Sequence, residues 1–573
     1  MTSHHRFAFP AVLAAALASA CSSGSGATIG GPGPGAGGSG ATSSGGTGAT
    51  SAGGTSASGA GAGGTAAMGT AGSSGTGAGG SSGSGAAGST GAGGTGPTVG
   101  INGNAGPWGT PVAGGPTANG TMVTGSVTVN RGSPNGKVGP GFLGFSVEKT
   151  HLTNSTYTGM NAPLIALYNL IGPVNLRVGA NDVERCTWVP AQPPAGGARP
   201  YGFKIGTAMV DGLNDFLTAT KAKVIYGLNY TLDQPQNDAD EATYAHMKLG
   251  AALDGFEIGN ELNKYGAWPA DLRTQWEALA TAVLGAVPDA RLIGPASTAG
   301  GGVDGLSVPF AHDESAKFGA KLVQLTQHYY LGAAGSSASV SLMQTIKQDI
   351  IDDAATLNTA ATGNNIAEGY RFGEANSFFG HGQAGISDTL IAALWSLDLM
   401  FVNATHGSSG VNFHGGETGM DGTVPFSYEP IEELDGVVQA AKPVYDGMLL
   451  FYLAGQGKTL ATTVSSSNPN FTAYALDYTA DNSTSLVLNN KNGTTGVQVT
   501  VDLGSAVTSA SAIYLQSTTP SLPTAPSDTV VIAGAGVTKT GTWARNAPFI
   551  QSTSGNTATV FVPPASAALV RIQ

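Results

Sequence analysis

The chain has 573 residues, of which 36 are acidic and 24 are basic, so its formal net charge is −12. This negative balance argues against a protein that binds the nucleic-acid backbone, which requires a basic surface. The two cysteines and nine histidines form no cluster with the spacing of metal ligands, so we expect neither a metal site nor a cofactor.

The first 21 residues are typical of an export signal. A short basic start at His4, His5 and Arg6 precedes an apolar run that is too short to span a bilayer comfortably. Small residues then lead to Cys21, and the segment resembles a bacterial lipoprotein signal, in which this cysteine is lipidated. Ordinary cleavage without a lipid is the alternative. We therefore expect an exported protein of the bacterial cell envelope, either anchored through Cys21 alone or extracellular.

Residues 22–118 are dominated by glycine, alanine, serine and threonine, and no charged residue or histidine lies between Arg6 and Arg131. A segment of this composition cannot bury enough apolar surface to offset the entropy of ordering it. We therefore predict a disordered tether. A flexible chain of this length has a mean end-to-end span of roughly 55 Å.

Between residues 141 and 455, short apolar runs alternate with stretches of helical periodicity. Eight runs are predicted as buried strands: 141–148, 174–180, 223–230, 254–261, 291–297, 322–330, 369–376 and 410–415. Helices are predicted at 161–171, 207–222, 238–250, 270–287, 339–360, 386–405 and 444–454, whereas 298–321 is less clearly helical. Eight such units favour an α/β fold of the (β/α)8 barrel type. A doubly wound sheet is the competitor, but no glycine-rich phosphate loop follows the first strand.

Residues 456–573 have a different pattern, in which polar turns separate short alternating segments. Strands are predicted at 471–478, 484–490, 496–503, 509–515, 529–536 and 558–564, and the last eight residues also read as a strand. This spacing predicts an appended antiparallel β-sandwich. We expect residues 119–140, with the strand-like segment 122–130, to complete it.

Two acidic residues close predicted barrel strands. Glu261 follows Asn260 at the end of the fourth strand, and Glu374 ends the seventh. Because the carboxyl ends of barrel strands surround the active site, both side chains are expected at the same mouth. One carboxyl can protonate a leaving oxygen while the other attacks the anomeric carbon, and Asn260 can bind the 2-hydroxyl of the sugar. The alternative is that both are structural acids that cap helices or form ion pairs.

At this point the sequence resembles glycoside hydrolase family 79, a clan A family that includes heparanase and microbial β-glucuronidases. The resemblance covers about 120–573, and the two glutamate segments are its most specific part. It is carried by FLGFSVEKTHL (142–152), NLRVGANDVER (175–185), FEIGNELNKYG (256–266), TQHYYLG (326–332), RFGEANSFFGHGQAGISDTLIAALWSLDLM (371–400), GVNFHGG (410–416) and KPVYDGMLLFYLAG (442–455). It implies a (β/α)8 barrel with a β-sandwich built from both chain ends, and retaining hydrolysis.

The resemblance also implies roles for individual residues. Glu261 is the expected acid/base and Glu374 the expected nucleophile. Arg177 is similar to the arginine that orients the nucleophile in this clan, although a salt bridge at the bottom of the barrel is the alternative. Tyr330 is expected to donate a hydrogen bond to Glu374, as tyrosines of the family do, whereas the neighbouring His328 is equally compatible with the core.

Further polar and aromatic residues are candidates for sugar binding. Glu148, Asn181 and Asp182 lie at the ends of the first two predicted strands, where sugar hydroxyls need partners, although each can instead cap a loop. Tyr265, like Trp188 and Trp268, can offer a face to a sugar ring, but such aromatic residues more often serve packing.

One departure from the family bears on the substrate. In family glucuronidases, a tyrosine five residues after the nucleophile helps to hold the carboxylate of the sugar, together with the backbone amides just beyond. Here that position is Phe379, followed by Gly380 and His381, and Tyr428 can supply a hydroxyl.

We expect a retaining exo-β-glycosidase of the β-glucuronidase type that acts on a uronic-acid-containing glycan or glycoside. The alternatives are the same barrel acting on a neutral β-glycoside, and a surface glycan-binding protein without activity.

Overall fold

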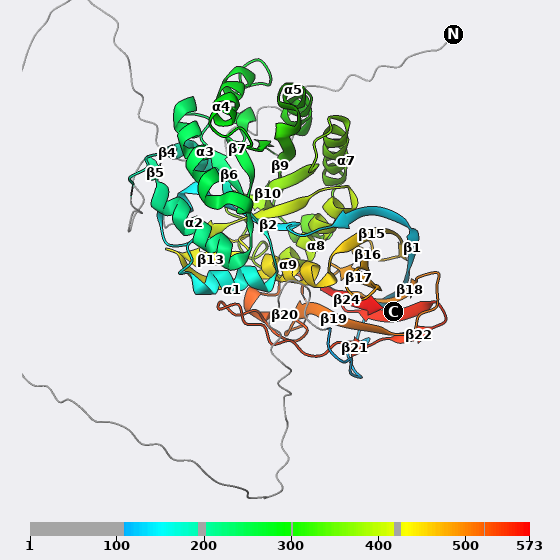
Figure 1. Ribbon diagram of the computed structural model, residues 1–573. Helices are drawn as coiled ribbons and strands as arrows, with labels where there is room; N and C mark the ends of the chain where they lie inside the picture. The colour runs from blue at the N-terminus through cyan, green and yellow to red at the C-terminus, as the bar shows by residue number, and fades with distance from the viewer. Residues whose placement is uncertain (1–107, 193–201, 299–301, 418–425, 521) are drawn as a thin grey trace, which may run out of the picture. The chain divides into compact units, whose positions relative to one another are not determined.

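The computed structural model describes residues 108–192, 202–298, 302–417, 426–520 and 522–573 (Figure 1). The predictions for the export signal, Cys21 and residues 22–107 of the tether lie outside these ranges. Among the described residues, no helix is both long enough and apolar enough to cross a bilayer.

Eight parallel strands form a closed barrel, as the sequence predicts. In barrel order they are β2 (Leu143–Glu148), β3 (Asn175–Gly179), β6 (Lys223–Leu228), β7 (Leu253–Ile258), β8 (Leu292–Ser297), β9 (Leu322–Ala333), β10 (Tyr370–Phe379) and β11 (Gly410–His414). Pairing of Val411 with Leu143 joins the last strand to the first and closes the barrel. The strands are almost continuously buried because helices cover their outer faces and side chains fill the interior.

Helices lie outside the barrel strands (Figure 1). They are α1 (Ala162–Leu170), α2 (Thr207–Thr220), α3 (Pro235–Leu249), α4 (Arg273–Ala286), α5 (Val308–Phe318), α6 (Val340–Gln344), α7 (Gln348–Gly363), α8 (Leu390–Thr405) and α9 (Pro443–Ala454). The single helix predicted at 339–360 is wrong: it is two helices, because Thr345 and Lys347 have extended backbones. In the ambiguous segment 298–321, a π-helical turn at Val303–Ser307 leads into α5.

The remaining strands form a curled, mostly antiparallel sheet around a second apolar core. Its order is β20 (Val530–Ile532), β19 (Ala510–Ser517), β24 (Ser566–Ile572), β17 (Ser483–Asn490), β16 (Phe471–Tyr478), β15 (Gly457–Ser466), β1 (Met122–Val138), β18 (Gly496–Asp502), β23 (Thr557–Val562) and β22 (Ser552–Ser554), while β21 (Phe549–Ile550) pairs with β19. Strand β15 was not predicted, and β1 pairs antiparallel with β15 but parallel with β18. The appended sandwich of the predicted fold class is therefore present, with one parallel pair.

Residues 108–118, expected to belong to the tether, pack against this sheet. Trp108 donates a hydrogen bond from its indole to Ser511 at 2.7 Å, and the guanidinium of Arg571 lies 4.7 Å from its ring centre. Val112 forms a β-bridge with Phe549. The prediction of disorder is wrong for these residues, because Trp108 and Val112 supply apolar surface that a segment of glycine, alanine, serine and threonine lacks.

Helix α8 connects the barrel to the curled sheet. Asp398 on this helix forms a buried ion pair with Lys491 and accepts hydrogen bonds from Thr472, Tyr474 and Asn489. Along the chain, α8 connects β10 to β11. The curled sheet therefore supports the side of the barrel that carries Glu374.

Two small sheets lie beside the barrel strands. β4 (Cys186–Trp188) pairs with β5 (Phe203–Ile205), and β12 (Gly416–Glu417), β13 (Ile431–Leu434) and β14 (Val437–Ala441) form a three-stranded sheet.

Candidate active site

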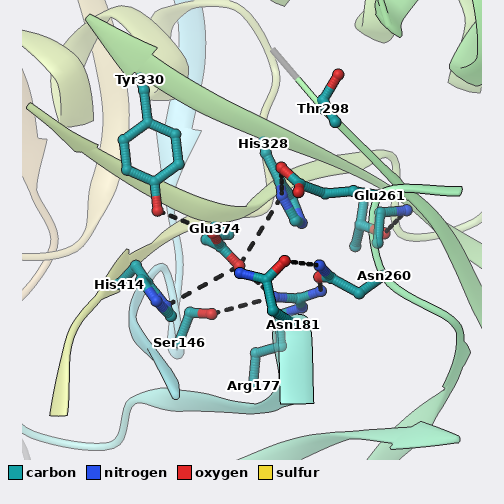
Figure 2. Close-up of polar contacts among 12 residues, drawn as sticks. Ser146, Arg177, Asn181, Asn260, Glu261, Thr298, His328, Tyr330, Glu374 and His414 are labelled. Carbon is teal, nitrogen blue, oxygen red and sulfur yellow. Dashed lines mark hydrogen bonds and ion pairs between the residues drawn. The ribbon is translucent and has the colours of Figure 1, made fainter. Parts of the chain in front are cut away.

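Glu374 lies in β10 and is 3% exposed. A shift in the pairing of β10 with β9 between Phe372 and Glu374 interrupts the regular alternation there. The carboxylate accepts hydrogen bonds from the Arg177 guanidinium at 2.9 Å and from the Tyr330 hydroxyl at 2.8 Å (Figure 2). Both contacts were expected from the sequence, and both hold the carboxylate in one orientation.

Arg177 of β3 is fully buried and gathers four partners around the barrel axis. Besides Glu374, it donates to Glu257 of β7 at 2.5 Å, to the Ser146 hydroxyl at 3.1 Å and to Asn260 Oδ1 at 2.8 Å. One guanidinium therefore connects the first, second, fourth and seventh barrel strands. It forms the contact expected with Glu374 and, through the same guanidinium, a buried ion pair with Glu257.

The charge of Glu374 is set by opposing effects. Burial raises the pKa of its carboxyl, but the nearby imidazoles of His414 and His328, the guanidinium of Arg177 and the Tyr330 hydrogen bond together bring the pKa well below its usual range. An ionised carboxylate is the form that can act as a nucleophile.

Glu261 occupies the loop directly after β7 and has a left-handed backbone conformation, with φ of 50°. Its backbone N–H donates to the Ala296 carbonyl at 2.7 Å. Glu184 accepts the backbone N–H of Asn260 at 2.9 Å and those of Tyr230 and Thr231 at 3.0 and 2.8 Å. A single half-buried carboxylate thus fixes the peptide that precedes Glu261.

The two predicted carboxylates meet across the mouth of the barrel. Ligand atoms of Glu261, His328 and Glu374 all lie within 4.8 Å of one another (Figure 2). In retaining glycosidases the two carboxyl groups are about 5–5.5 Å apart, whereas inverting enzymes need about 6.5–9.5 Å to admit a water molecule. The separation fits the retaining geometry.

The same three residues are the only group among the described residues with the spacing of a metal site. However, Arg177 and Lys264 already place positive charge against the two carboxylates. The arrangement therefore suits proton transfer and nucleophilic attack better than the binding of a cation.

Two histidines stand beside the carboxylates. His328 Nδ1 lies 3.2 Å from Glu261 Oε1 and 3.9 Å from Glu374 Oε2, and burial lowers the pKa of this histidine to about 4. His414 Nδ1 lies 3.9 Å from Glu374 Oε2, and burial lowers its pKa as well. Burial thus disfavours the charged form of both imidazoles, whereas the adjacent Glu374 carboxylate favours it.

The polar residues predicted at the first two strands lie around this centre. Glu148 accepts the backbone N–H of Asp182 at 2.7 Å, and its Oε1 lies 4.0 Å from His414 Nε2. Asp182 is engaged by the Thr150 hydroxyl at 2.7 Å and by Arg185 at 3.1 Å. Asn181 accepts a 3.4 Å hydrogen bond from Asn260 and lies at the centre of Figure 2. The structure brings Glu148 and Asn181 to the site, whereas Asp182 is held in a local cap.

The residues considered for a sugar carboxylate form an aromatic cluster beside Glu374. Tyr428 lies with its ring centre 6.1 Å from that of Tyr330, and Phe379 meets Tyr330 edge to face at 6.2 Å. His381 is exposed and stacks on Phe426 at 4.4 Å, and Gly380 precedes it at the end of β10. Tyr428 therefore contacts Tyr330 and His414, which adjoin Glu374, whereas the ring contact of His381 is with Phe426.

Several residues of the site were not predicted from the sequence. Glu257, Glu184 and Ser146 carry no motif of their own, because their role depends on Arg177 and on the loop after β7. His414 lies within the quoted segment GVNFHGG, but its role was not recognised. The aromatic candidates divide: Trp188 and Trp268 are buried, whereas Tyr265 is 48% exposed.

A scan against protein-family models and a search of curated protein sequences give no match. Solved structures do match. A 4-O-α-L-rhamnosyl-β-D-glucuronidase from Fusarium oxysporum is 20% identical with a TM-score of 0.63, covering 79% of this chain and all of that one. A family 51 arabinofuranosidase from Xanthomonas axonopodis is 14% identical with a TM-score of 0.54 over 79% of this chain and 100% of its own. A family 44 xyloglucanase from Paenibacillus polymyxa is 12% identical with a TM-score of 0.51, covering 78% and 99%.

These likenesses establish that the chain shares its barrel-and-sheet fold with glycoside hydrolases, as the resemblance seen in the sequence implies.

Proposed function

We propose that this chain is a retaining exo-β-glycosidase in which Glu374 is the nucleophile and Glu261 the acid/base. The observation that carries the proposal is the separation of the two carboxylates, whose facing oxygens lie within 4.8 Å. The fold shared with glycoside hydrolases supports it independently.

In the first step, a Glu374 oxygen attacks the anomeric carbon while the glycosidic C–O bond breaks. Glu261 gives its proton to the leaving oxygen, so the leaving group departs as an alcohol and the sugar stays attached to Glu374. In the second step, Glu261 takes a proton from water, whose oxygen attacks the same carbon and releases Glu374. Arg177 and Tyr330 keep Glu374 ionised and oriented, which makes it both a ready nucleophile and a good leaving group.

The proposed substrate is a β-linked uronic acid at the non-reducing end of a glycan or glycoside. This part rests on the glucuronidase among the structural neighbours and on the Tyr428, Gly380 and His381 side of the site. A neutral β-glycoside is the second candidate, because Phe379 has no hydroxyl to offer a carboxylate and packs against Tyr330 instead.

A panel of p-nitrophenyl glycosides tests both parts. The β-glucuronide should be cleaved faster than the β-glucoside, β-galactoside and β-xyloside, and a faster neutral glycoside would replace the uronate proposal without affecting the reaction type. A 2-deoxy-2-fluoro glycoside of the preferred sugar should label Glu374, and mass spectrometry that finds the adduct elsewhere would reject it as the nucleophile. Glycan binding with no turnover of any member would instead favour a binding protein.

The proposal also includes export to the cell envelope and a lipid on Cys21. Metabolic labelling with a fatty acid should mark the wild-type chain, and Cys21→Ser should lose the label. If the wild-type chain is exported but unlabelled, the anchor is wrong and simple secretion replaces it.

A further inference from the structure

Lys264 is a cation at the rim of the site that the reaction described above does not use. It ends the short helical turn Leu262–Lys264, three residues after Glu261, and its ammonium contacts Glu261 Oε2. The other oxygen of Glu261 faces His328 Nδ1 at 3.2 Å. In the free protein, both oxygens of the proposed acid/base are therefore engaged.

The position of Lys264 indicates which part of the substrate it would meet. His328 lies between the two carboxylates, whereas Lys264 contacts the Glu261 oxygen that His328 does not, and its side chain is 37% exposed. The sugar under attack must lie over Glu374, and the oxygen that leaves must reach Glu261. The next unit of the substrate then extends from Glu261 toward Lys264, an argument that rests on the proposed function.

An exposed aromatic residue adjoins this cation. Tyr265 follows Lys264 directly, is 48% exposed, and lies with its ring centre 6.2 Å from that of the buried Tyr230. Tyr230 is in turn fixed by its backbone N–H, which donates to Glu184. A supported aromatic face beside an ammonium fits a sugar ring that carries a negative charge.

We propose that Lys264 and Tyr265 form the leaving-group subsite and that this subsite takes a sugar bearing a carboxylate or a sulfate. The anion pairs with the Lys264 ammonium and draws it away from Glu261. Because the substrate anion replaces Glu261 as its partner, the Lys264 ammonium, whose side chain is 37% exposed, keeps a negative counter-charge during the exchange. An oxygen of Glu261 is then free to hold the proton that passes to the glycosidic oxygen. A negatively charged leaving group therefore helps Glu261 to act as the acid that protonates it.

The test compares Lys264→Gln with Lys317→Gln as a matched control. Lys317 is similarly exposed, at 40%, and likewise contacts a glutamate, Glu277, but it lies on the outer helix α5. The substrates are three disaccharides with the same non-reducing sugar, chosen from the glycoside panel, linked to a neutral hexose, a hexuronate or a sulfated hexose.

For the wild type, kcat/KM should be about two- to fivefold higher on at least one acidic disaccharide than on the neutral one. Lys264→Gln should remove this preference, while Lys317→Gln should keep it. Raising the ionic strength to 1 M should weaken the preference in the wild type, because screening acts on an exposed pair. A preference for the hexuronate alone or the sulfated hexose alone identifies the anion.

The two possible failures are distinguishable. If the wild type cleaves the disaccharides with no acidic preference, or if Lys264→Gln changes all three rates equally, the subsite is wrong and the glycosidase stands. If the wild type cleaves none of the three and no member of the glycoside panel, the proposed function falls and the subsite falls with it.

Discussion

Glu374 and Glu433 are both almost completely buried carboxylic acids, yet their surroundings move their pKa values in opposite directions. At Glu374 the pKa lies well below its usual range, although burial alone would raise it, because His414, His328, Arg177 and Tyr330 act against burial. Glu433 lies in β13 and lines a small cavity with Phe145, Tyr157, Tyr168 and Ile431. Burial there raises its pKa to about 8.

The difference shows that burial alone does not determine whether a carboxyl group is ionised. Glu433 Oε2 has no hydrogen-bond partner among the described residues. An unpaired buried charge is costly, so the carboxyl is more stable when it holds a proton and is neutral. Each Glu374 oxygen instead has a fixed donor, and one donor carries a permanent charge. The protein therefore keeps one acid ionised at the barrel mouth and one neutral in the small sheet beside the barrel.

The largest difference between the two acids is expected when each is replaced by the neutral glutamine. Glu374→Gln should lower kcat by about 10⁴- to 10⁶-fold on the preferred aryl glycoside, because it removes the attacking oxygen. Glu433→Gln is the matched control and should keep kcat within about twofold, since it mimics the neutral form that burial already favours. Comparable losses in both variants would mean that Glu374 has no special role.

The second prediction separates the two carboxylates at the mouth. Glu261→Ala should lower kcat/KM by about 10²- to 10⁴-fold on glycosides with poor leaving groups, because protonation of the leaving oxygen is lost. Bond cleavage in 2,4-dinitrophenyl glycosides should be much less affected, because that leaving group needs no proton. Measuring the first turnover across a series of phenols gives the slope against leaving-group acidity. A slope as shallow as that of the wild type would remove Glu261 from the acid role.

The third prediction concerns the donors that distinguish Glu374 from Glu433. Tyr330→Phe removes a hydrogen bond that lowers the pKa of Glu374, so the pKa should rise. The acidic limb of the kcat/KM profile should move to higher pH, and the rate at its optimum should fall about 10- to 100-fold, the worth of a hydrogen bond to a charged group. A lower rate with an unmoved acidic limb would limit Tyr330 to binding the substrate.

The last prediction concerns stability and not activity. Because folding raises the pKa of Glu433 from the ordinary 4.5 to about 8, the unfolded chain releases this proton before the folded one does. The contribution to the free energy of unfolding is therefore full below pH 4.5 and declines by at most ~1.4 kcal/mol per pH unit up to about pH 8. Glu433→Gln should remove this decline, measured as the difference between urea unfolding of wild type and variant from pH 5 to 8. Parallel curves would contradict a neutral Glu433.

Much of the barrel was predictable because its signals are local. Each of the eight predicted strands overlaps an observed strand, since a buried parallel strand reads as a short apolar run. The break between α6 and α7 was missed because the residues around Thr345 fit helical periodicity, and the extended backbone depends on contacts such as Lys347 Nζ donating to the Leu331 carbonyl. Strand β15 was missed because half of its ten residues are threonine or serine and its few apolar residues do not alternate clearly.

The residues of the candidate site likewise fall into those that the sequence identifies and those that only the structure identifies. Glu261 and Glu374 could be named from the sequence because each lies in or next to a recognisable strand, although Glu374 lies within β10 and does not end it. Glu184 and Glu257 could not, because each acts through a partner distant in the chain: Glu184 through the peptide of Asn260, Glu257 through Arg177. Nor does the sequence show that Lys264 and His328 take one oxygen each of Glu261.

By itself, the sequence determined that a barrel forms, roughly where along the chain its strands lie, and which acids lie in or just after two of them, because apolar periodicity is a property of neighbouring residues. Only the tertiary structure decided how far apart the two carboxylates stand and which charges and donors surround each one. Those quantities depend on barrel closure, which brings the strands of Arg177, Glu261 and Glu374 to one axis and sets the dielectric and the hydrogen bonds each acid experiences.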